Sequence, residues 1–346
     1  MAPVGSRESL AAAFQAGADS VYFGIGTLNM RSKSANEFTI DDLKEIASLC
    51  AERGVKSYLT VNTVIYDEDL PLMRQIVDAA KEAKISAVIA SDAAVMMYCR
   101  QQGVEVHLST QLNISNVEAL KFYSQFADVV VLARELNLRQ VKRIYDEIQQ
   151  QRITGPRGDL IRIEMFCHGA LCMAVSGKCY LSLNNAGKSA NRGACMQTCR
   201  RAYIVKDKER DVELEIDNQY IMSPKDLKTI GFMDQMIKAG VRVFKIEGRA
   251  RGPEYVRTTR KTSGASSART ASGETSTSKR PVHWSWSPHR VPAAARWQPA
   301  CPSFTTKTSG ASRQATPSSR HSLFGICRSS IRSIWRTRRR LPTLRT

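Results

Sequence analysis

The feature that most limits the fold of this chain is a regular alternation of strand-like and helical segments over residues 1–256. Apolar runs rich in Val, Ile, Leu and aromatic residues occur at 20–25, 56–62, 85–90, 104–109, 128–133, 161–167 and 241–248, with a stub at 1–4. Segments with helical spacing of apolar residues separate them, at 6–18, 39–54, 69–84, 93–102, from 115, at 137–151 and at 223–240. Continuous apolar runs of this kind are typical of parallel strands buried on both faces.

This alternation predicts an α/β fold in which each helix returns the chain to the next parallel strand. Eight strands favour a (β/α)8 TIM-type barrel, and a doubly wound sheet is the alternative. The first strand is incomplete, because the chain begins where that strand should be ending, and the helical pattern stops beyond Tyr255. We therefore expect residues 1–256 to form a TIM-like barrel with an incomplete first strand, an incomplete last helix and an unpaired sheet edge that promotes self-association.

The longest break between two strand-like runs holds four cysteines, Cys172, Cys179, Cys195 and Cys199. We treat residues 168–221 as a cysteine-rich insertion after the seventh strand, in which glycines supply the tight turns that bring the thiols together. Thiolates gathered in this way suit zinc or an iron–sulfur cluster. The alternative is a set of ordinary buried thiols, which the polar, Gly-rich surroundings disfavour.

The net charge of +19 is concentrated in residues 257–346. This tail holds eighteen Lys or Arg side chains and a single acidic one, Glu274, so residues 1–256 carry a net charge of only +2. All four tryptophans lie in the tail as well, where the helical periodicity is absent. So abrupt a change predicts translation in a shifted frame, with a natural, basic, disordered arm as the alternative.

Two further observations concern the cellular compartment. Residues 1–7 lack the apolar core of a signal peptide, and no apolar run approaches the length of a membrane span. Seven cysteines, an odd number, precede residue 257, which fits metal-bound or free thiols in a reducing cytosol better than a disulfide framework. We expect a cytoplasmic protein that does not enter a membrane.

Polar side chains follow the strand-like runs at the ends where barrel enzymes hold their active sites. Each alone would more often be a helix cap or a surface residue, but their repetition after successive strands predicts a site. His107 is different, since it lies in mid-strand and is expected to be a hydrogen-bonded core residue. The candidate catalytic residues are Arg31, Asn62, Gln111, Arg134, Glu135, His168, Glu247 and Arg249.

The chemistry of these residues indicates anions as ligands. Arg31, Arg134 and Arg249 could clamp a dicarboxylate by bidentate pairing. Basic side chains between residues 188 and 210 form either a solvated charged face or a patch that follows phosphates. The chain has no HExxH, G-x-S-x-G or thioredoxin C-x-x-C motif, so a recognised protease machinery is absent from the sequence.

A series of motifs in the first 256 residues resembles one known family. They are APVG at 2–5, AGADSVYFG at 16–24, STQLNISN at 109–116, ARE at 133–135, HGALCMAVSGKC at 168–179, SANRGAC at 189–195, SPKDL at 223–227 and KIEGRARGPEYV at 245–256. The chain resembles the collagenase-like peptidase family of unknown catalytic type, especially its short members described from oral Bacteroidetes. The resemblance implies a metal-dependent protease that degrades collagen-type substrates.

Other members of that family, which the cysteine segment resembles equally, are iron–sulfur proteins that hydroxylate RNA bases or ubiquinone precursors. Those acting on RNA draw on prephenate, so the resemblance implies RNA or collagen-type protein as the partner and a small carboxylate as co-substrate. By position, the four cysteines would bind a [4Fe-4S] cluster, with zinc or another divalent metal as the alternative. Residue chemistry favours iron–sulfur-dependent hydroxylation of an RNA base, and collagen degradation is the alternative function.

Overall fold

The computed structural model describes residues 1–33, 38–206, 209, 212–216 and 222–257. The chain divides into two units, Met1–Ser276 and Thr277–Thr346, and every described residue belongs to the first. The expectation of a shifted frame or a disordered arm concerns residues that lie, apart from Arg257, outside the described part. The boundary at residue 256 therefore stays a prediction.

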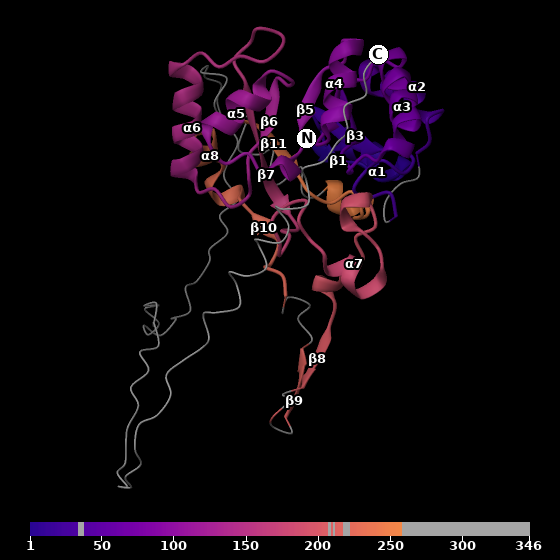
Figure 1. The fold of residues 1–346 in the computed structure, drawn as a ribbon, viewed down its shortest axis with the longest axis vertical. Helices are drawn as coiled ribbons and strands as arrows, with labels where there is room; N and C mark the ends of the chain where they lie inside the picture. The colour runs from indigo at the N-terminus through magenta and orange to yellow at the C-terminus, as the bar shows by residue number, and fades with distance from the viewer. Residues whose placement is uncertain (34–37, 207–208, 210–211, 217–221, 258–346) are drawn as a thin grey trace, which may run out of the picture. The chain divides into compact units, whose positions relative to one another are not determined.

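A curled sheet of parallel strands forms the centre of the first unit (Figure 1). Neighbours in sequence pair from β1 to β7, and β11 pairs in parallel with the other edge of β7. This confirms the predicted α/β, TIM-type architecture. The eight parallel strands are β1 Ala2–Pro3, β2 Ser20–Gly24, β3 Lys56–Val61, β4 Ala87–Ala90, β5 Val106–Leu108, β6 Val129–Val131, β7 Arg162–Gly169 and β11 Val241–Ile246.

Met1 joins the two ends of this series of strands. Its amino group donates a hydrogen bond to the Phe244 carbonyl at 2.8 Å, and the Ile246 amide donates to the Met1 carbonyl at 3.2 Å. The first strand is as short as expected, but within the described residues it is paired with β2 on one side and tied to β11 on the other. The expected unpaired edge beside the first strand is therefore wrong.

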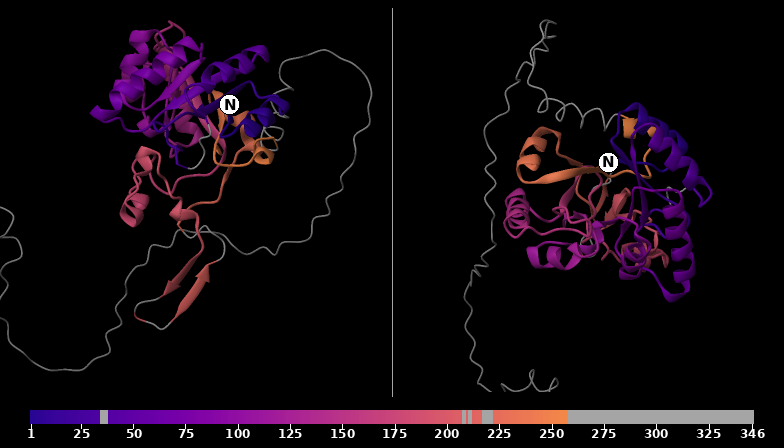
Figure 2. Two further views of the ribbon diagram at one scale, coloured as in Figure 1. Left: turned by 90° about the vertical axis from the view of Figure 1, so that its right-hand side faces the viewer. Right: turned by 90° about the horizontal axis from the view of Figure 1, so that it is seen from above.

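Helices cover the outside of the curled sheet (Figures 1 and 2). Each buries one face, as α3 (Leu70–Glu82) does with Met73, Ile76, Val77 and Ala80, at the spacing of an amphipathic helix. Side-chain caps fix several starts, and Asn137 forms a reciprocal capping box with Gln140. The helices between parallel strands are α1 Arg7–Gln15, α2 Asp42–Glu52, α3 Leu70–Glu82, α4 Ala93–Gln102, α5 Val117–Ser124, α6 Leu138–Gln150 and α8 Met233–Lys238.

Two helix starts differ from the sequence-based expectation. The helix α5, which the capping pattern of Ser115 and Glu118 predicts to start at Ser115, is instead capped by Asn116, whose side chain accepts from the Ala119 amide. The helix expected from Ser223 begins only at Met233, because the preceding segment is bound to the end of β7. Thr229 donates to the Cys167 carbonyl from both its amide (3.1 Å) and its hydroxyl (2.8 Å). The short strand β10, Leu227–Lys228, is antiparallel to β7 at the same place.

The cysteine-rich insertion leaves the barrel after β7 and returns at β10. Its described part contains the short helix α7 (Leu181–Ala186), the 3-10 turns η3 (Ala190–Arg192) and η4 (Thr198–Arg200), and an antiparallel hairpin of β8 (Tyr203–Lys206) and β9 (Glu213–Ile216). After β11 the chain is helical again at residues 253–257, where the description ends. No helix among the described residues is both long and apolar enough to cross a membrane.

Candidate active site

A cavity of about 140 Å³ lies at the carboxyl ends of the barrel strands, beneath the cysteine-rich insertion. Side chains from β2, β3, β4, β7 and β11, and from the loops after β2, β3, β5, β6 and β11, form its floor and sides. Six of the eight predicted catalytic residues and all four insertion cysteines line it. These residues are Arg31, Asn62, Gln111, Arg134, Glu247 and Arg249 with Cys172, Cys179, Cys195 and Cys199.

The insertion is attached to the barrel mainly through Arg192. The guanidinium of Arg192 forms an ion pair with Asp69, donates to the Val64 carbonyl at 2.7 Å and lies over the Tyr66 ring, 4.2 Å from its centre. Next to it, the Val64 amide donates to the Asn191 carbonyl at 3.1 Å. The loop after β3 therefore holds one side of the insertion over the cavity.

Two other loops hold the rest of the insertion. The Lys33 amide, after β2, donates to the Gly193 carbonyl at 3.3 Å, and Asn113, after β5, donates through Nδ2 to the Ser176 carbonyl at 2.8 Å. Gly193 has φ +81°, and a Cβ there would lie 2.1 Å from the Ser32 hydroxyl oxygen. The insertion and the segment after β2 approach each other so closely here that position 193 requires glycine.

None of the four insertion cysteines is in a disulfide. The pKa of the Cys199 thiol is raised, first by burial and then by the neighbouring Cys195, Cys172 and Cys179, which places the four sulfurs in one electrostatic environment. Over the described residues, however, no three His, Cys, Asp or Glu side chains converge closely enough to hold a metal ion. The cysteines share a cavity wall without forming a coordination shell.

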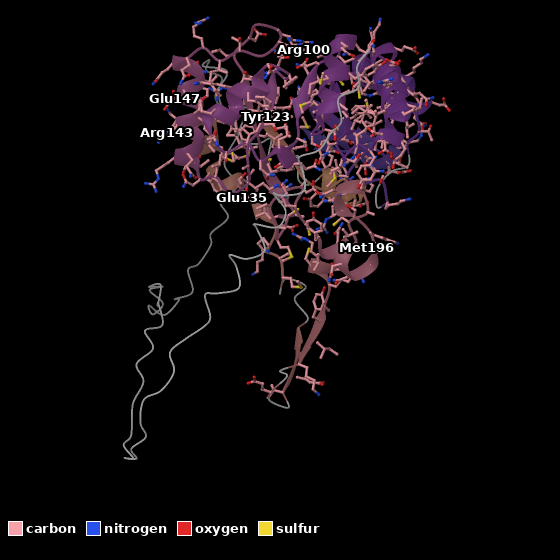
Figure 3. All side chains as sticks on the ribbon, viewed as in Figure 1. Arg100, Tyr123, Glu135, Arg143, Glu147 and Met196 are labelled. Atoms are coloured by element: carbon pink, nitrogen blue, oxygen red, sulfur yellow. The ribbon has the colours of Figure 1, made fainter. Side chains whose placement is uncertain are left out.

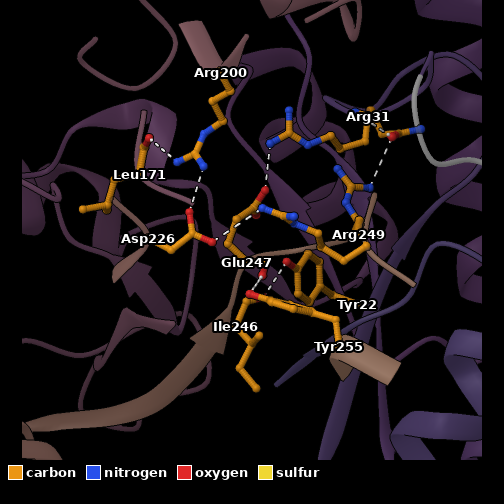
Figure 4. Close-up of polar contacts among 11 residues, drawn as sticks. Tyr22, Arg31, Leu171, Arg200, Asp226, Ile246, Glu247, Arg249 and Tyr255 are labelled. Carbon is orange, nitrogen blue, oxygen red and sulfur yellow. Dashed lines mark hydrogen bonds and ion pairs between the residues drawn. The ribbon is translucent and has the colours of Figure 1, made fainter. Parts of the chain in front are cut away.

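Glu247 and Arg31 form the central ion pair of the cavity (Figure 4). Arg31 Nη2 lies 2.7 Å from Glu247 Oε1. Burial acts to raise the pKa of Glu247, but Arg31, Arg134 and Arg249 outweigh it and lower this pKa to about 2. The pKa of Arg31 is raised, chiefly by Glu247. Glu247 is thus a stable carboxylate that positions Arg31.

Arg249 is buried and bound to neutral partners. Its Nη1 donates to Thr60 Oγ1 at 2.8 Å and to Asn29 Oδ1 at 3.2 Å, and burial lowers its pKa to about 10. The end of β2 leaves room for it, because a Cβ at Gly24 would lie 2.7 Å from Arg249 Nη1 and 2.5 Å from Asn29. This glycine lets the guanidinium occupy the floor of the cavity.

Arg134 has the least satisfied side chain at the site. Its guanidinium lies over the Phe166 ring, 4.3 Å from the ring centre. Its Nε and Nη1 atoms are buried, and neither has a hydrogen-bond partner among the described residues. Buried donors without partners are costly, so these atoms mark a place where an acceptor from a ligand would fit.

The remaining predicted residues lie apart from the cavity lining. Glu135 is exposed at the surface (Figure 3). His168 lies at the end of β7 with its ring 5.8 Å from that of Tyr255. Burial and, to a smaller extent, the charge of Lys228 lower the pKa of His168 against the opposing effect of Asp226. His107 is a buried core residue, as expected, with Nε2 3.3 Å from Glu105 Oε1.

Sequence reasoning missed Lys245, which also lines the cavity. It lies on β11 with its Nζ 2.8 Å from Glu164 Oε1 and 4.7 Å from the centre of the Tyr22 ring. The available signal was a lysine in the middle of the apolar run VRVFKIEG. A charged residue within a strand buried on both faces must have a partner, and here the partner is on β7.

Comparison with known proteins gives relatives of two kinds. A protein named collagenase from Porphyromonas gingivalis (strain W83) is 71% identical over 258 residues, which cover 75% of this chain and 62% of that protein. A tRNA hydroxylation protein P1 from Bacillus subtilis is 36% identical over 265 residues, covering 75% of this chain and 60% of that protein. This chain therefore spans less than two thirds of the length of either relative.

Among solved structures, the U32 peptidase Mk0906 is 12% identical, with a TM-score of 0.40 over 67% of this chain and 86% of that one. The family model of peptidase family U32 matches residues 5–282. That range includes every strand of the barrel except β1, the whole cysteine-rich insertion and all residues that line the cavity. The protein therefore belongs to peptidase family U32.

Proposed function

We propose that this protein is an iron–sulfur-dependent hydroxylase that acts on an RNA base and uses a small carboxylate as co-substrate. One observation carries the proposal: a single cavity is lined both by four free cysteines and by four basic side chains. The cysteines suit a soft metal centre, and the cations suit an anionic organic ligand beside it. The basic residues are Arg31, Arg134, Lys245 and Arg249.

The donor set fits a cluster in its chemistry. Cys172, Cys179, Cys195 and Cys199 are the residues that would hold it, because they are free thiols on one wall of the cavity. When bound, an iron–sulfur cluster supplies one-electron redox chemistry. Zinc is the competing metal for four thiolates.

The charges of the cavity support a carboxylate co-substrate. Arg31 is neutralised by Glu247 and Lys245 by Glu164, whereas Arg134 and Arg249 have no acidic ion-pair partner among the described residues. Two such guanidinium groups in a desolvated cavity favour a doubly charged anion, since guanidinium pairs with carboxylate in a planar, bidentate geometry.

The chain's own residues would bind and orient this anion. The unpartnered Nε and Nη1 atoms of Arg134 can donate to one carboxylate, and the ring of Phe166 holds the guanidinium plane in place. The insertion, attached through Arg192, would cover the bound anion from above. An RNA substrate is supported by the relative whose name states tRNA hydroxylation.

Collagen degradation is the second candidate, and it is favoured by the name of the relative with 71% identity. The cavity gives it less support. Of the described side chains that line it, none is a histidine, and Glu247, with a pKa of about 2, is a weak general base near neutral pH. A hydrolytic reaction would need another base or a metal-bound water.

The first experiment identifies the metal. The full chain is purified without oxygen, and its visible absorption, iron, sulfide and zinc contents are measured for wild type, Cys195→Ala and Cys50→Ala. We expect a brown protein whose colour is lost in Cys195→Ala and kept in Cys50→Ala, since Cys50 is buried on α2 away from the cavity. A colourless wild type with stoichiometric zinc would overturn the cluster.

The second experiment separates the two activities. Type I collagen and bulk RNA from a deletion strain are each incubated with the reconstituted protein, with Cys172→Ala and with Arg134→Gln. We expect a hydroxylated nucleoside with wild type alone. Collagen cleavage that persists through purification and is lost in Arg134→Gln would instead establish the peptidase.

A further inference from the structure

A line of titratable side chains crosses the interior of the barrel. Lys245 on β11, Glu164 on β7, His107 on β5 and Glu105 just before β5 are all buried, with side-chain exposures of 7%, 0%, 2% and 8%. The interior of a TIM-type barrel is ordinarily packed with branched apolar residues. Burying several ionisable groups there is costly, so the arrangement calls for a function.

The four side chains contact one another in sequence. Lys245 Nζ lies 2.8 Å from Glu164 Oε1, Glu164 Oε2 lies 4.0 Å from His107 Nδ1, and His107 Nε2 lies 3.3 Å from Glu105 Oε1. Glu164 Oε2 and His107 Nδ1 are both buried, and neither has a hydrogen-bond partner among the described residues. A proton on either atom, with a small side-chain rotation, would complete a hydrogen bond between them.

The two ends of this line open on opposite faces of the barrel. Lys245 lines the cavity at the carboxyl ends of the strands. Glu105 lies at the amino end of β5, where its Oε2 is 2.8 Å from Arg157 Nη1 and its Oε1 is 3.4 Å from Arg162 Nη2. The side chain of Arg157 is 61% exposed, so the far end reaches solvent.

Aromatic rings insulate the line from its surroundings. The Tyr58 ring lies against the His107 ring at 4.6 Å, while Tyr22 and Phe166 flank the ammonium group of Lys245. Burial, followed by the charges of Glu105 and Glu164, raises the pKa of Tyr58 to about 12, and burial also raises the pKa of Tyr22. Both phenols therefore stay neutral near pH 7 and do not take protons from the line.

We propose that Lys245, Glu164, His107 and Glu105 form a proton relay between the cavity and the solvent at the opposite end of the barrel. For a step that consumes a proton, the Lys245 ammonium breaks an N–H bond and protonates the reacting group. The His107 imidazolium then passes its Nδ1 proton to the Glu164 carboxylate, and Glu164, now in its acid form, reprotonates Lys245 and returns to the carboxylate. A solvent proton enters at His107 Nε2 by way of Glu105. One proton thus enters from solvent for each proton delivered to the reacting group. The same transfers in reverse order would remove a proton from the reacting group to solvent.

The relay deepens the proposed function, because Lys245 would serve the reacting group in the same cavity, but its operation is independent of the substrate's identity. The first test therefore uses no substrate. NMR spectra of the full chain, labelled in His and Glu and assigned with His107→Gln and Glu164→Gln, are recorded from about pH 5 to 9, around the ordinary pKa of histidine. Folding at each pH is checked by circular dichroism.

We expect the signals of the His107 ring and of the Glu164 carboxyl group to change over the same pH steps, because the titration steps of two coupled sites belong to the pair. Lys245→Met should move these shared steps to higher pH by about one unit or more, because it removes the cation that stabilises the Glu164 carboxylate. Lys81→Met, at an exposed lysine on α3, should leave them unchanged. If the two groups show no pH step in common, the coupling that the relay requires is absent and the relay is refuted.

The second test measures the rate of RNA product formation as a function of pH for wild type, Glu164→Gln and His107→Gln. We expect at least a tenfold loss of rate in each variant, a displaced limb of the pH profile and unchanged RNA affinity. A role confined to stability would leave the pH profile in place and would refute the relay. If the wild type forms no RNA product at all, the proposed function fails, and the NMR titration still decides the relay.

Discussion

Glu247 and Arg31 illustrate how the cavity is organised at the scale of single residues. The two side chains come from opposite ends of the described sequence and are largely buried, with exposures of 15% and 20%. Removing one member of such a pair leaves the other charge desolvated and unpaired, which costs more than the intact pair contributes. Their geometry therefore depends on both being present and ionised.

We predict that this pair makes the stability of the protein depend on pH in the acid range. The pKa of Glu247 is about 2 in the folded state and about 4.3 in an unfolded chain. Because the folded-state pKa is the lower one, the stabilisation is complete above pH 4.3 and is lost as the pH falls towards 2. Urea denaturation should show Glu247→Gln to be less stable than wild type by about 2 kcal/mol at pH 6, with a smaller difference at pH 3.

The matched control for this prediction is Glu118→Gln, whose carboxylate pairs with Lys121 on the exposed surface of α5. Exposed pairs contribute about 0.5 kcal/mol, so this variant should match wild type at both pH values. A stability difference for Glu247→Gln that does not change with pH would show that its carboxylate is not the group that titrates.

Sequence reasoning located most of these residues but not their partners. Arg31, Arg134, Glu247 and Arg249 could be named because polar residues at strand ends are conspicuous after apolar runs. Lys245 and Glu164 lie inside strands. A single charged residue in an apolar strand sequence does not indicate which neighbouring strand will carry its ion-pair partner. Their pairing depends on the register of β11 against β7, which only the folded barrel fixes.

At the scale of elements, the cysteine-rich insertion acts as a cover for the cavity, and Arg192 is its main attachment. Arg192 is part of η3, whereas its partners Val64 and Asp69 belong to the loop and the 3-10 turn η1 (Asp67–Asp69) after β3. The short elements of the insertion bury little apolar surface of their own, so specific polar contacts carry the attachment.

We predict that Arg192→Gln loosens the insertion while leaving the barrel intact. The variant loses the ion pair with Asp69 and the contact with the Tyr66 ring, for a loss of about 1 kcal/mol in this partly exposed position. Limited proteolysis should cleave residues 178–201 several times faster, with little change in the melting temperature. Lys188→Gln, at an exposed lysine in the same segment, should be cleaved like wild type, and equal cleavage of both variants would contradict the prediction.

At the scale of the whole molecule, the charge is divided unequally along the chain. Residues 257–346 carry a net charge of +17 and residues 1–256 only +2. Binding to nucleic acid through phosphates depends on the number of cations that displace counterions, and it weakens steeply as salt is added. Non-specific RNA binding of the full chain is therefore expected to come mainly from residues 257–346.

We predict that RNA affinity and RNA modification respond to different residues. The affinity of the full chain for bulk RNA, measured by fluorescence anisotropy between about 50 and 200 mM salt, should fall steeply and with the same slope in wild type and Arg134→Gln. Product formation should be lost in Arg134→Gln. A reduced salt slope in this variant would instead mean that the cavity mouth itself contacts phosphates.

The sequence by itself determined the order of the elements. All eight parallel strands and the position of the cysteine-rich insertion follow from local patterns, because apolar periodicity and turn residues act over a few neighbouring positions. Local signals failed where a distant contact was stronger. Pro224 is a good first residue for a helix, but the bonds from Thr229 to Cys167 hold the segment against β7 instead.

Only the tertiary structure decided which side chains meet. The closure of the sheet through Met1, the cavity shared by cysteines and arginines, and the buried line from Lys245 to Glu105 all join residues far apart in the chain. Such contacts depend on strand register and on the curvature of the sheet, and shifting a strand by one residue would turn its side chains to the other face. Local sequence patterns fix which residues can form strands, but the closed packing of all the strands together sets their register.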